Sequence, residues 1–248
     1  MTLIIASSAR RKIIVKAVAE PPPSSGLEYV GGATGNHSGD TSPWSVSLTG
    51  LTGGLASAPA EGDIVVLCHS TYSGSIEDGG PVAAAGFTEI ADLYANDGAD
   101  ANLSVSYKIM TATPDTSVSI LGTGYYANYQ MVAVSVWRGI DVAVPIDVTS
   151  TTATGTNTAK PNPPAITPTT SGAVILVAGG SSHYLTDQTF TAAELSNFVT
   201  AGHGGASVGI GSYEWTSGAF DPAAWGFSGT DASDYSWAAV SLALRPGS

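Results

Sequence analysis

Alternation of apolar and polar side chains is the dominant pattern of this chain, and its strongest example is the segment 130–138, QMVAVSVWR. Val132, Val134 and Val136 fall on one face of this segment, and the residues between them fall on the other. A period of two residues is that of a pleated strand, and β-branched valine favours that conformation. Gly139 follows the run and is typical of a turn. The pattern therefore predicts a central β-strand that ends in a turn.

A second copy of this strand closes the chain at residues 235–245, YSWAAVSLALR. Residues 239–242 match residues 133–136 at an offset of 106. Because shorter matches follow in the same order, an internal duplication is favoured over the general similarity of any two β segments. The shorter matches relate residues 212–214 to 106–108, 193–195 to 88–90, and 172–177 to 62–67.

Further alternating or valine-rich segments predict about ten strands separated by turns rich in Gly, Asn, Asp and Pro. No segment of normal helix length has a period of 3.6 residues, and the best candidate, residues 191–197, would make at most about two turns. The expected strands are 44–48, 64–69, 87–93, 103–110, 117–121 and 130–137 in the first half, and 173–178, 195–199, 207–215, 225–228 and 236–244 in the second.

The segment 149–170 is rich in Thr and Pro and separates the two halves, about 28–148 and 165–246. It is either a linker between two domains or an extended crossover within one sandwich. The crossover is favoured, because half of the strands alone would leave one sheet face uncovered, whereas two halves packed face to face bury both. The predicted fold is an all-β, two-sheet, jelly-roll-like β-sandwich with an internal pseudo-duplication.

Composition limits the partners of this chain. Charged residues make up 11% of it and hydrophobic residues 43%, which suits short strands and tight turns and argues against disorder. The net charge is −12 and the isoelectric point about 4.4, which disfavours nucleic acid and anionic membranes as partners. No apolar run approaches transmembrane length, so membrane insertion is not expected.

Charge is unevenly distributed along the chain. Four of the eight basic residues, Arg10, Arg11, Lys12 and Lys16, lie near its start. With two acidic residues, residues 1–28 carry a charge of +2, which leaves −14 on the remainder. The segment is not a secretion signal, because its apolar stretch is very short and precedes the charges.

Residues 1–27 are predicted to form an N-terminal β-prone arm and a proline-rich spacer, followed by a sandwich domain at 28–248. The pieces TLIIASS and KIIVKAVAE are typical of short strands, and PPPSSG at residues 21–26 is semi-rigid. One interpretation is that the arm adds a strand to an acidic or open-edged partner, anchored by its four basic residues. The other is an edge hairpin folded onto its own domain.

Cysteine and tryptophan are expected mainly in the core. The single residue Cys68 cannot form an intrachain disulfide and lies among apolar neighbours, so a buried, inert thiol is favoured over a nucleophile or ligand. The absence of a disulfide framework fits assembly in a reducing cytoplasm. Trp44, Trp137, Trp215 and Trp237 lie in predicted strands and are assigned to the core.

Catalytic and metal-binding patterns are weak. His37, His69, His183 and His203 have no metal-ligand spacing, and the chain has no GxSxG elbow and no phosphate-binding glycine loop. A hydrolytic role for the Ser-Ser-His sequence at 181–183 is disfavoured, because Ser and Gly neighbours arise freely in this composition. We therefore expect no enzymatic activity, no bound metal and no cofactor.

Two loops are candidates for binding. The acidic segment 92–102, DLYANDGADAN, is either a hairpin turn or a cation site, and the turn is favoured. In the segment 122–129, GTGYYANY, Tyr125, Tyr126 and Tyr129 are interleaved with Gly and Asn, a mixture that supplies rigid contact area in binding loops and suits sugar rings. The alternative is that these tyrosines pack over the end of the sandwich.

Six strand and turn motifs in residues 60–246 resemble a recurrent group of proteins from tailed bacteriophages and related prophages. These motifs carry strand and turn chemistry rather than active-site chemistry, so the resemblance concerns fold and broad role. Members of the group are tail-fibre, tail-tip, head-fibre or decoration proteins with jelly-roll-like β-sandwiches. The motifs are GDIVVLCH, GFTEIADL, VSYKIMTATPD, VAVSVWRGID, SGAVILVAGG and AAVSLALRP.

The resemblance implies a non-enzymatic viral structural protein, assembled in the host cytoplasm and displayed on the virion surface, on capsid or tail. It further implies other virion proteins as partners, a homo-oligomer, and host attachment through surface glycans as an additional role. A free carbohydrate-binding module or lectin is the alternative. The missing secretion signal and the basic arm favour the virion protein.

Overall fold

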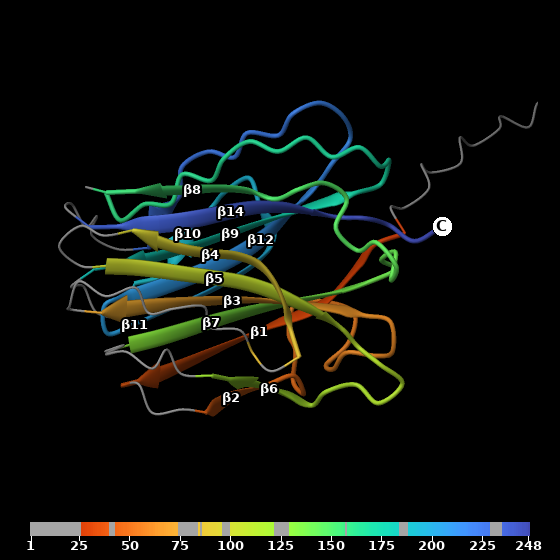
Figure 1. Ribbon diagram of the computed structural model, residues 1–248, viewed down its shortest axis with the longest axis horizontal. Coiled ribbons are helices and arrows are strands. Elements are labelled where there is room, and N and C mark those ends of the chain that lie inside the picture. The colour runs from red at the N-terminus through yellow and green to blue at the C-terminus, as the bar shows by residue number, and fades with distance from the viewer. Residues whose placement is uncertain are drawn as a thin grey trace, which may run out of the picture.

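Every regular element that the structure describes is a β-strand (Figure 1). The computed structural model describes residues 26–39, 43–73, 84, 86–95, 100–121, 129–156, 158–183, 188–228 and 235–248. The all-β prediction is confirmed within these residues, and the weak helix candidate at 191–197 instead contains strand and turn. In the same part of the chain, no helix is long and apolar enough to cross a bilayer.

Two five-stranded antiparallel sheets form the centre of the molecule, one from each half of the chain. The first sheet has the order β1 (Glu28–Ser38), β7 (Tyr129–Arg138), β3 (Ile64–Ser73), β5 (Asp100–Ile109) and β4 (Thr88–Ala95). The second sheet has the order β8 (Thr151–Gly155), β14 (Trp237–Leu244), β9 (Val174–Ser182), β12 (Ala206–Glu214) and β11 (Ser196–His203).

A short two-stranded ribbon accompanies each sheet. The first ribbon pairs β2 (Trp44–Ser47) with β6 (Ser117–Ile120), and the second pairs β10 (Phe190–Thr191) with β13 (Gly226–Phe227). The outer face of the first sheet shares a buried cluster with β2 and β6, and the outer face of the second shares one with Phe190. The layers therefore run ribbon, sheet, sheet, ribbon.

The main core lies between the two sheets and confirms that the halves pack face to face. Because side chains alternate along a strand, every second residue of each sheet points into this layer. Its centre is made by β3 and β9, which contact each other across the layer. The buried residues that these two strands contribute are Ile64, Val66 and Cys68 from β3, and Val174, Leu176 and Ala178 from β9.

The two halves have the same strand order, with β1, β7, β3, β5 and β4 corresponding to β8, β14, β9, β12 and β11. Even a local irregularity recurs, since β4 is bulged between Glu89 and Ala91 and β11 between Ser196 and Val199. Across the core, β1 faces β11 while β4 faces β8. The halves are therefore arranged like the two subunits of a twofold dimer.

The sequence offset of 106 between β7 and β14 was wrong by one residue. Ile64 pairs with Trp137 in the first half, and the matching Val174 pairs with Leu244 in the second, so the structural offset is 107. At the sequence offset, Val134 of the outer cluster would correspond to Val240 of the main core. A slip of one residue moves a side chain to the opposite face of the sheet.

The strand connectivity also corrects the jelly-roll prediction. A jelly roll is a pair of sheets assembled from two Greek keys, with strands passing between the sheets. Here the strands of the first large sheet all precede those of the second in the chain, with β8 of the second sheet coming from the segment 149–170 that was predicted as a linker or crossover, and two ribbons add further layers. The sandwich was predictable from alternation, whereas the connectivity depends on pairings that alternation does not specify.

In the two large sheets, two strands were not predicted, and both are at sheet edges; the two-residue β10 of the second ribbon was also missed. β1 contains the sequence VGGATG, and β8 is TTATG. Glycine and alanine are depleted in strands, so neither segment carries the valine-rich signal of β7. Beyond β8, residues 158–170 lie along the second sheet, where the carbonyl oxygens of Pro161 and Pro164 accept hydrogen bonds from Trp225 N and Ser241 Oγ.

Most of the core predictions are confirmed. Cys68 is buried, and burial raises the pKa of its thiol far above the usual range, so it stays protonated. Trp137 and Trp237 are buried as predicted. Trp44 and Trp215 are only partly buried, because they lie at the margins of the outer layers.

Arg138 ends β7 and Arg245 directly follows the corresponding strand β14, but the two arginines have different partners. Arg138 Nε and Nη2 donate to the two carboxylate oxygens of Asp63, which is fully buried, at 2.8 and 2.9 Å. At the corresponding position, Arg245 lies 3.8 Å from Asp147. Burial raises the pKa of Asp147, but hydrogen bonds from Thr170 and Thr169 outweigh that effect and hold it below its usual value.

We predict that Arg138→Ala lowers the free energy of unfolding by about 3 kcal/mol, because it leaves the buried Asp63 carboxylate without its cation. Arg245→Ala is the matched control and should cost about 1 kcal/mol or less, since Asp147 keeps its threonine donors. Urea denaturation of the three proteins measures the difference. Equal losses in the two variants would contradict the assigned roles.

Candidate functional site

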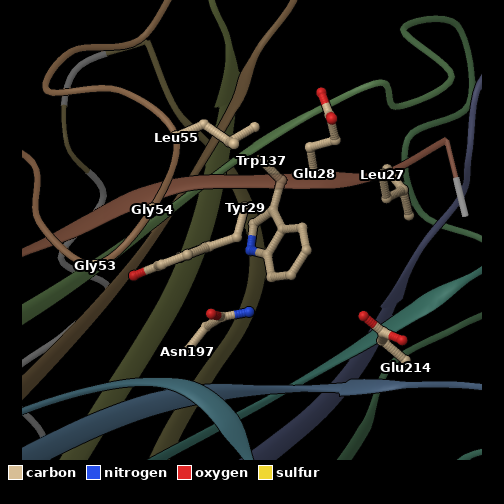
Figure 2. Close-up of a pocket in the computed structure, with 9 residues that line it drawn as sticks. All are labelled: Leu27, Glu28, Tyr29, Gly53, Gly54, Leu55, Trp137, Asn197 and Glu214. Atoms are coloured by element: carbon tan, nitrogen blue, oxygen red, sulfur yellow. The ribbon is translucent and has the colours of Figure 1, made fainter. Parts of the chain in front are cut away.

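A groove runs between the edge strands β1 and β11, where the two large sheets separate (Figure 2). Its main part has a volume of about 430 Å³, and an adjoining part continues between the same two strands. Tyr29, Gly53 and Asn197 line both parts, so the groove is continuous. The main part is lined by Leu27, Glu28, Tyr29, Gly53, Gly54, Leu55, Trp137, Asn197 and Glu214.

An aromatic pair forms the wall on the side of the first sheet. Tyr29 and Trp137 are cross-strand neighbours on β1 and β7, with ring centres 5.3 Å apart and planes tilted by 54°. Trp137 is 3% exposed and its Nε1 donates to Ser135 Oγ, so it supports Tyr29 from behind. Burial raises the pKa of Tyr29 to about 12, which keeps its hydroxyl protonated and able to donate.

Polar side chains form the opposite wall. Glu214 ends β12, in line with the inward-facing residues Val208 and Ile210 of the core. Asn197 lies on β11, and its Nδ2 donates to Ser212 Oγ at 3.0 Å. In Figure 2 both side chains extend from the second sheet toward the aromatic pair. The groove is thus the inter-sheet layer continued beyond the apolar core, with one apolar and one polar wall.

The bulge in β11 places Asn197 in the groove. Asn197 has φ of +50°, a left-handed conformation that asparagine tolerates better than most residues. The ladder between β11 and β12 shifts register between Ser196 and Val199, as expected for a bulge. The Asn197 side chain thereby leaves the alternation of its strand and points across the groove.

The loop of residues 53–56 borders the groove beside the outer edge of β1. Leu55 N and Ala56 N donate to the carbonyl oxygens of Tyr29 and Val30, so the loop pairs with the outer edge of β1. A Cβ on Gly54 would lie 2.5 Å from the Val30 carbonyl carbon, so only glycine permits this approach. Leu55 is 61% exposed and borders the groove.

Glycine also sets the floor of the groove. A Cβ on Gly32 would lie 2.3 Å from Val199 Cγ2 and 2.6 Å from the Tyr29 hydroxyl oxygen. The edge strands therefore approach most closely there because β1 has no side chain at that position. The sheets separate toward Glu28 and Glu214, where the groove opens.

Only one of the two carboxylates at the groove faces the aromatic wall. Glu214 points toward Trp137, whereas the Glu28 carboxylate points away from it (Figure 2). Glu28 pairs with Arg138 across the strands, and its charge helps to raise the pKa of that arginine, after the larger effect of the Asp63 hydrogen bond. The groove therefore presents one carboxylate to the aromatic wall, that of Glu214.

The aromatic pair is specific to one half of the molecule. The position of Tyr29 opposite Trp137 corresponds to that of Ile146 opposite Leu244 in the second half. Ile146 and Leu244 also contribute to the main core. Because the second half has the same strand arrangement with aliphatic side chains at these two positions, the fold does not require the two aromatic rings.

No protein family, curated protein or solved structure matches this chain. The site is therefore interpreted from its own geometry.

The predicted tyrosine loop is described only at its last residue. Tyr125 and Tyr126 lie outside the described residues, as do Arg10, Arg11, Lys12 and Lys16 of the arm. Tyr129 stacks on Tyr72 at 6.2 Å and meets His203 edge-on at 5.5 Å, which places it between the two halves. These contacts fit the packing alternative for Tyr129, and the binding role of the three tyrosines stays a prediction.

The histidines do not form a metal centre in the part of the chain that the structure describes, where no suitable group of three ligands occurs. His183 Nε2 forms a hydrogen bond with Ser207 Oγ, at 2.7 Å. This serine partner therefore lies on β12 and not in the Ser-Ser-His sequence. Ser207 Oγ donates to Gln188 O, and both members of the pair are fully buried, so no substrate can reach them. Residues 96–99 of the acidic loop lie outside the described residues.

Sequence reasoning missed the groove because its members are separated along the chain. Tyr29, Gly54, Trp137, Asn197 and Glu214 come from five segments and share no motif. Trp137 was assigned to the core, where most of its surface does lie. One available signal was Asn197 itself, because asparagine is among the residues that tolerate positive φ and it falls within the segment 195–199 that was predicted as a strand.

We predict that Asn197→Gly leaves the free energy of unfolding within about 1 kcal/mol of the native protein, because glycine adopts positive φ without strain while the bond to Ser212 is lost. Asn197→Val should be less stable than Asn197→Gly by about 1–2 kcal/mol, since a β-branched residue resists this conformation. Thermal and urea denaturation measure both. A valine variant as stable as the glycine variant would contradict the strain at this position.

Proposed function

We propose that this protein is a non-enzymatic surface protein of a tailed-phage particle that binds glycans in the groove between β1 and β11. The observation that carries the binding role is the pairing of an aromatic wall, Tyr29 on Trp137, with a polar wall, Asn197 and Glu214. The resemblance of the strand motifs to virion surface proteins carries the location.

The two walls match the two kinds of surface on a sugar. A pyranose ring has apolar C–H faces that pack on an aromatic ring, and its rim carries hydroxyl groups that donate and accept hydrogen bonds. Tyr29 offers the ring face and a hydroxyl, while Asn197 and Glu214 offer amide and carboxylate oxygens across the gap. An elongated groove open at one side suits a chain of sugars.

A binding role is better supported than cleavage. Glycoside hydrolysis generally uses two carboxylates flanking the bond, one as acid and the other as base or nucleophile. Of the groove carboxylates, Glu214 faces the aromatic wall and Glu28 points away. The groove thus supplies one of the two required groups.

The positions of the chain ends support attachment through the arm. The described chain begins at Gly26 beside Gly139, and Gly247 N donates to Gly139 O, so the beginning of the described chain and its C-terminal residues lie at the same end of the sandwich. Figure 1 shows the start of β1 and the C-terminus on the same side. An arm leaving this end can hold the protein to capsid or tail, and the groove begins at the same end, where Leu27 and Glu28 line it.

A free lectin or carbohydrate-binding module is the second candidate, because the groove alone suits it equally well. The two candidates differ in the role of residues 1–25. An arm that binds particle proteins supports the virion role, and an arm without such a partner supports the free lectin.

We predict that Tyr29→Leu weakens glycan binding roughly tenfold, about 1.4 kcal/mol, because leucine fills the space but offers no aromatic face. Ligands are first found on a glycan array, and the affinity of the best one is then measured by calorimetry. Tyr213→Leu is the matched control, since Tyr213 stacks on Phe220 at 3.9 Å on the outer face of the second sheet. Equal loss in both variants, or no ligand on the array, would refute the binding role.

We predict that deletion of residues 1–25 leaves a folded sandwich that no longer co-sediments with particles. The deletion stops before Leu27, which is 5% exposed and belongs to the core. A variant with glutamine at Arg10, Arg11, Lys12 and Lys16 should retain part of the binding, as should the native protein in 1 M salt, where the Debye length is about 3 Å. Full occupancy by the truncated protein would show that the arm is not the anchor.

A further inference from the structure

We propose that the groove selects sugars that carry a free amino group, with the Glu214 carboxylate as the group that recognises the ammonium. This inference rests on the proposed glycan-binding function and specifies the class of ligand. It is argued from the charges, the hydrogen-bonding groups and the aromatic ring of the groove.

The charges at the groove disfavour acidic sugars. Glu28 and Glu214 are the charged residues among those that line it, and both are acidic. Arg138, on the strand beside β1, is held by both oxygens of Asp63 at 2.8 and 2.9 Å. The whole chain carries −12. Among the described residues that line the groove, a carboxylated, sulfated or phosphorylated sugar would therefore meet like charge and no cation.

The polar wall has more acceptors than donors. An ionised Glu214 contributes two oxygens that only accept hydrogen bonds. Asn197 donates one of its two Nδ2 hydrogens to Ser212, which leaves one N–H as a donor and Oδ1 as an acceptor, so the wall still offers three acceptor oxygens against one donor. An ammonium group carries three N–H donors and no acceptor, so it complements this wall better than a hydroxyl or an acetamide does.

The aromatic wall also favours a cation. An ammonium within about 6 Å of an aromatic ring centre is attracted by the negative face of the ring. In Figure 2 Asn197 lies opposite Tyr29 and the Glu214 carboxylate points toward Trp137, so an amino group held by this wall faces the aromatic pair. The carboxylate and the ring thus act on the same positive charge, whereas acetylation of the amine removes both attractions.

The test compares three tetrasaccharides that differ at one substituent: a glucosamine tetramer, its fully N-acetylated form and the corresponding glucose tetramer. Affinities are measured by calorimetry at pH 6, where the amine is protonated. We expect the glucosamine tetramer to bind at least about tenfold more tightly than the other two, as a charge-assisted hydrogen bond is roughly twice as strong as a neutral one. The preference should weaken as the pH rises and the amine loses its proton.

Two isosteric variants separate recognition from general attraction to an acidic protein. Glu214→Gln should remove the preference for the amine, so that the glucosamine and glucose tetramers bind this variant with similar affinity. Glu28→Gln makes the same change of net charge at a carboxylate that points away from the aromatic wall, and it should retain the preference. Equal loss of preference in both variants would overturn the assignment to Glu214.

The outcomes distinguish this inference from the proposed function. Equal binding of the three tetrasaccharides, or tighter binding of the acetylated one, would overturn the amine preference and leave a glycan-binding groove. Failure of these probes and of every glycan on the array would overturn both. Tighter binding of the amine that is lost in Glu214→Gln but not in Glu28→Gln would support the inference.

Discussion

Mutual burial of two sheet faces is the interaction on which this molecule depends. Each half of the chain forms a five-stranded sheet with an apolar inner face, and each outer face already has its own ribbon and buried cluster. The inner faces are covered by each other, through residues such as Val66 and Leu176. Because apolar burial contributes roughly 25 cal/mol per Å², neither inner face is stable in water alone. The halves therefore form one cooperative sandwich, and every other feature is placed relative to that shared layer.

The groove follows from the way this layer ends. Where β1 and β11 approach at Gly32 and Val199, the layer is closed, and beyond that point the sheets separate. Residues that would be core in a longer sandwich then become groove walls. Tyr29 and Trp137 continue the apolar face of the first sheet, and Glu214 continues the inner row of β12 as a polar residue. Ligand binding at this position uses surfaces that the core already orients, so it needs no separate scaffold.

Local patterns in the sequence predicted most strands, but not how the strands pair or which residues meet between them. Alternation identified β7 and β14, through Val132, Val134 and Val136 and through Val240, Leu242 and Leu244, whereas a short continuous apolar run identified β9. Neither pattern identified β1 or β8, whose glycine and threonine residues resemble turns. The repeat was visible, yet its offset was wrong by one at Val134, since similar residues occupy both faces of a fully buried strand. The groove was out of reach because Tyr29, Asn197 and Glu214 meet only through strand pairing and the bulge in β11.

In the second half, Ile146 and Leu244 occupy the positions that correspond to Tyr29 and Trp137. This difference also determines how many glycan sites each chain can have. A repeated fold can in principle carry two equivalent sites, one at each related edge, but here the aromatic wall exists at one of them. In the proposed role, each chain then engages a single stretch of glycan with modest strength. Firm attachment would come from many copies acting together on one surface, where each bound chain raises the effective concentration of the next. Density of display, rather than affinity of one groove, would decide whether a particle stays bound or moves on.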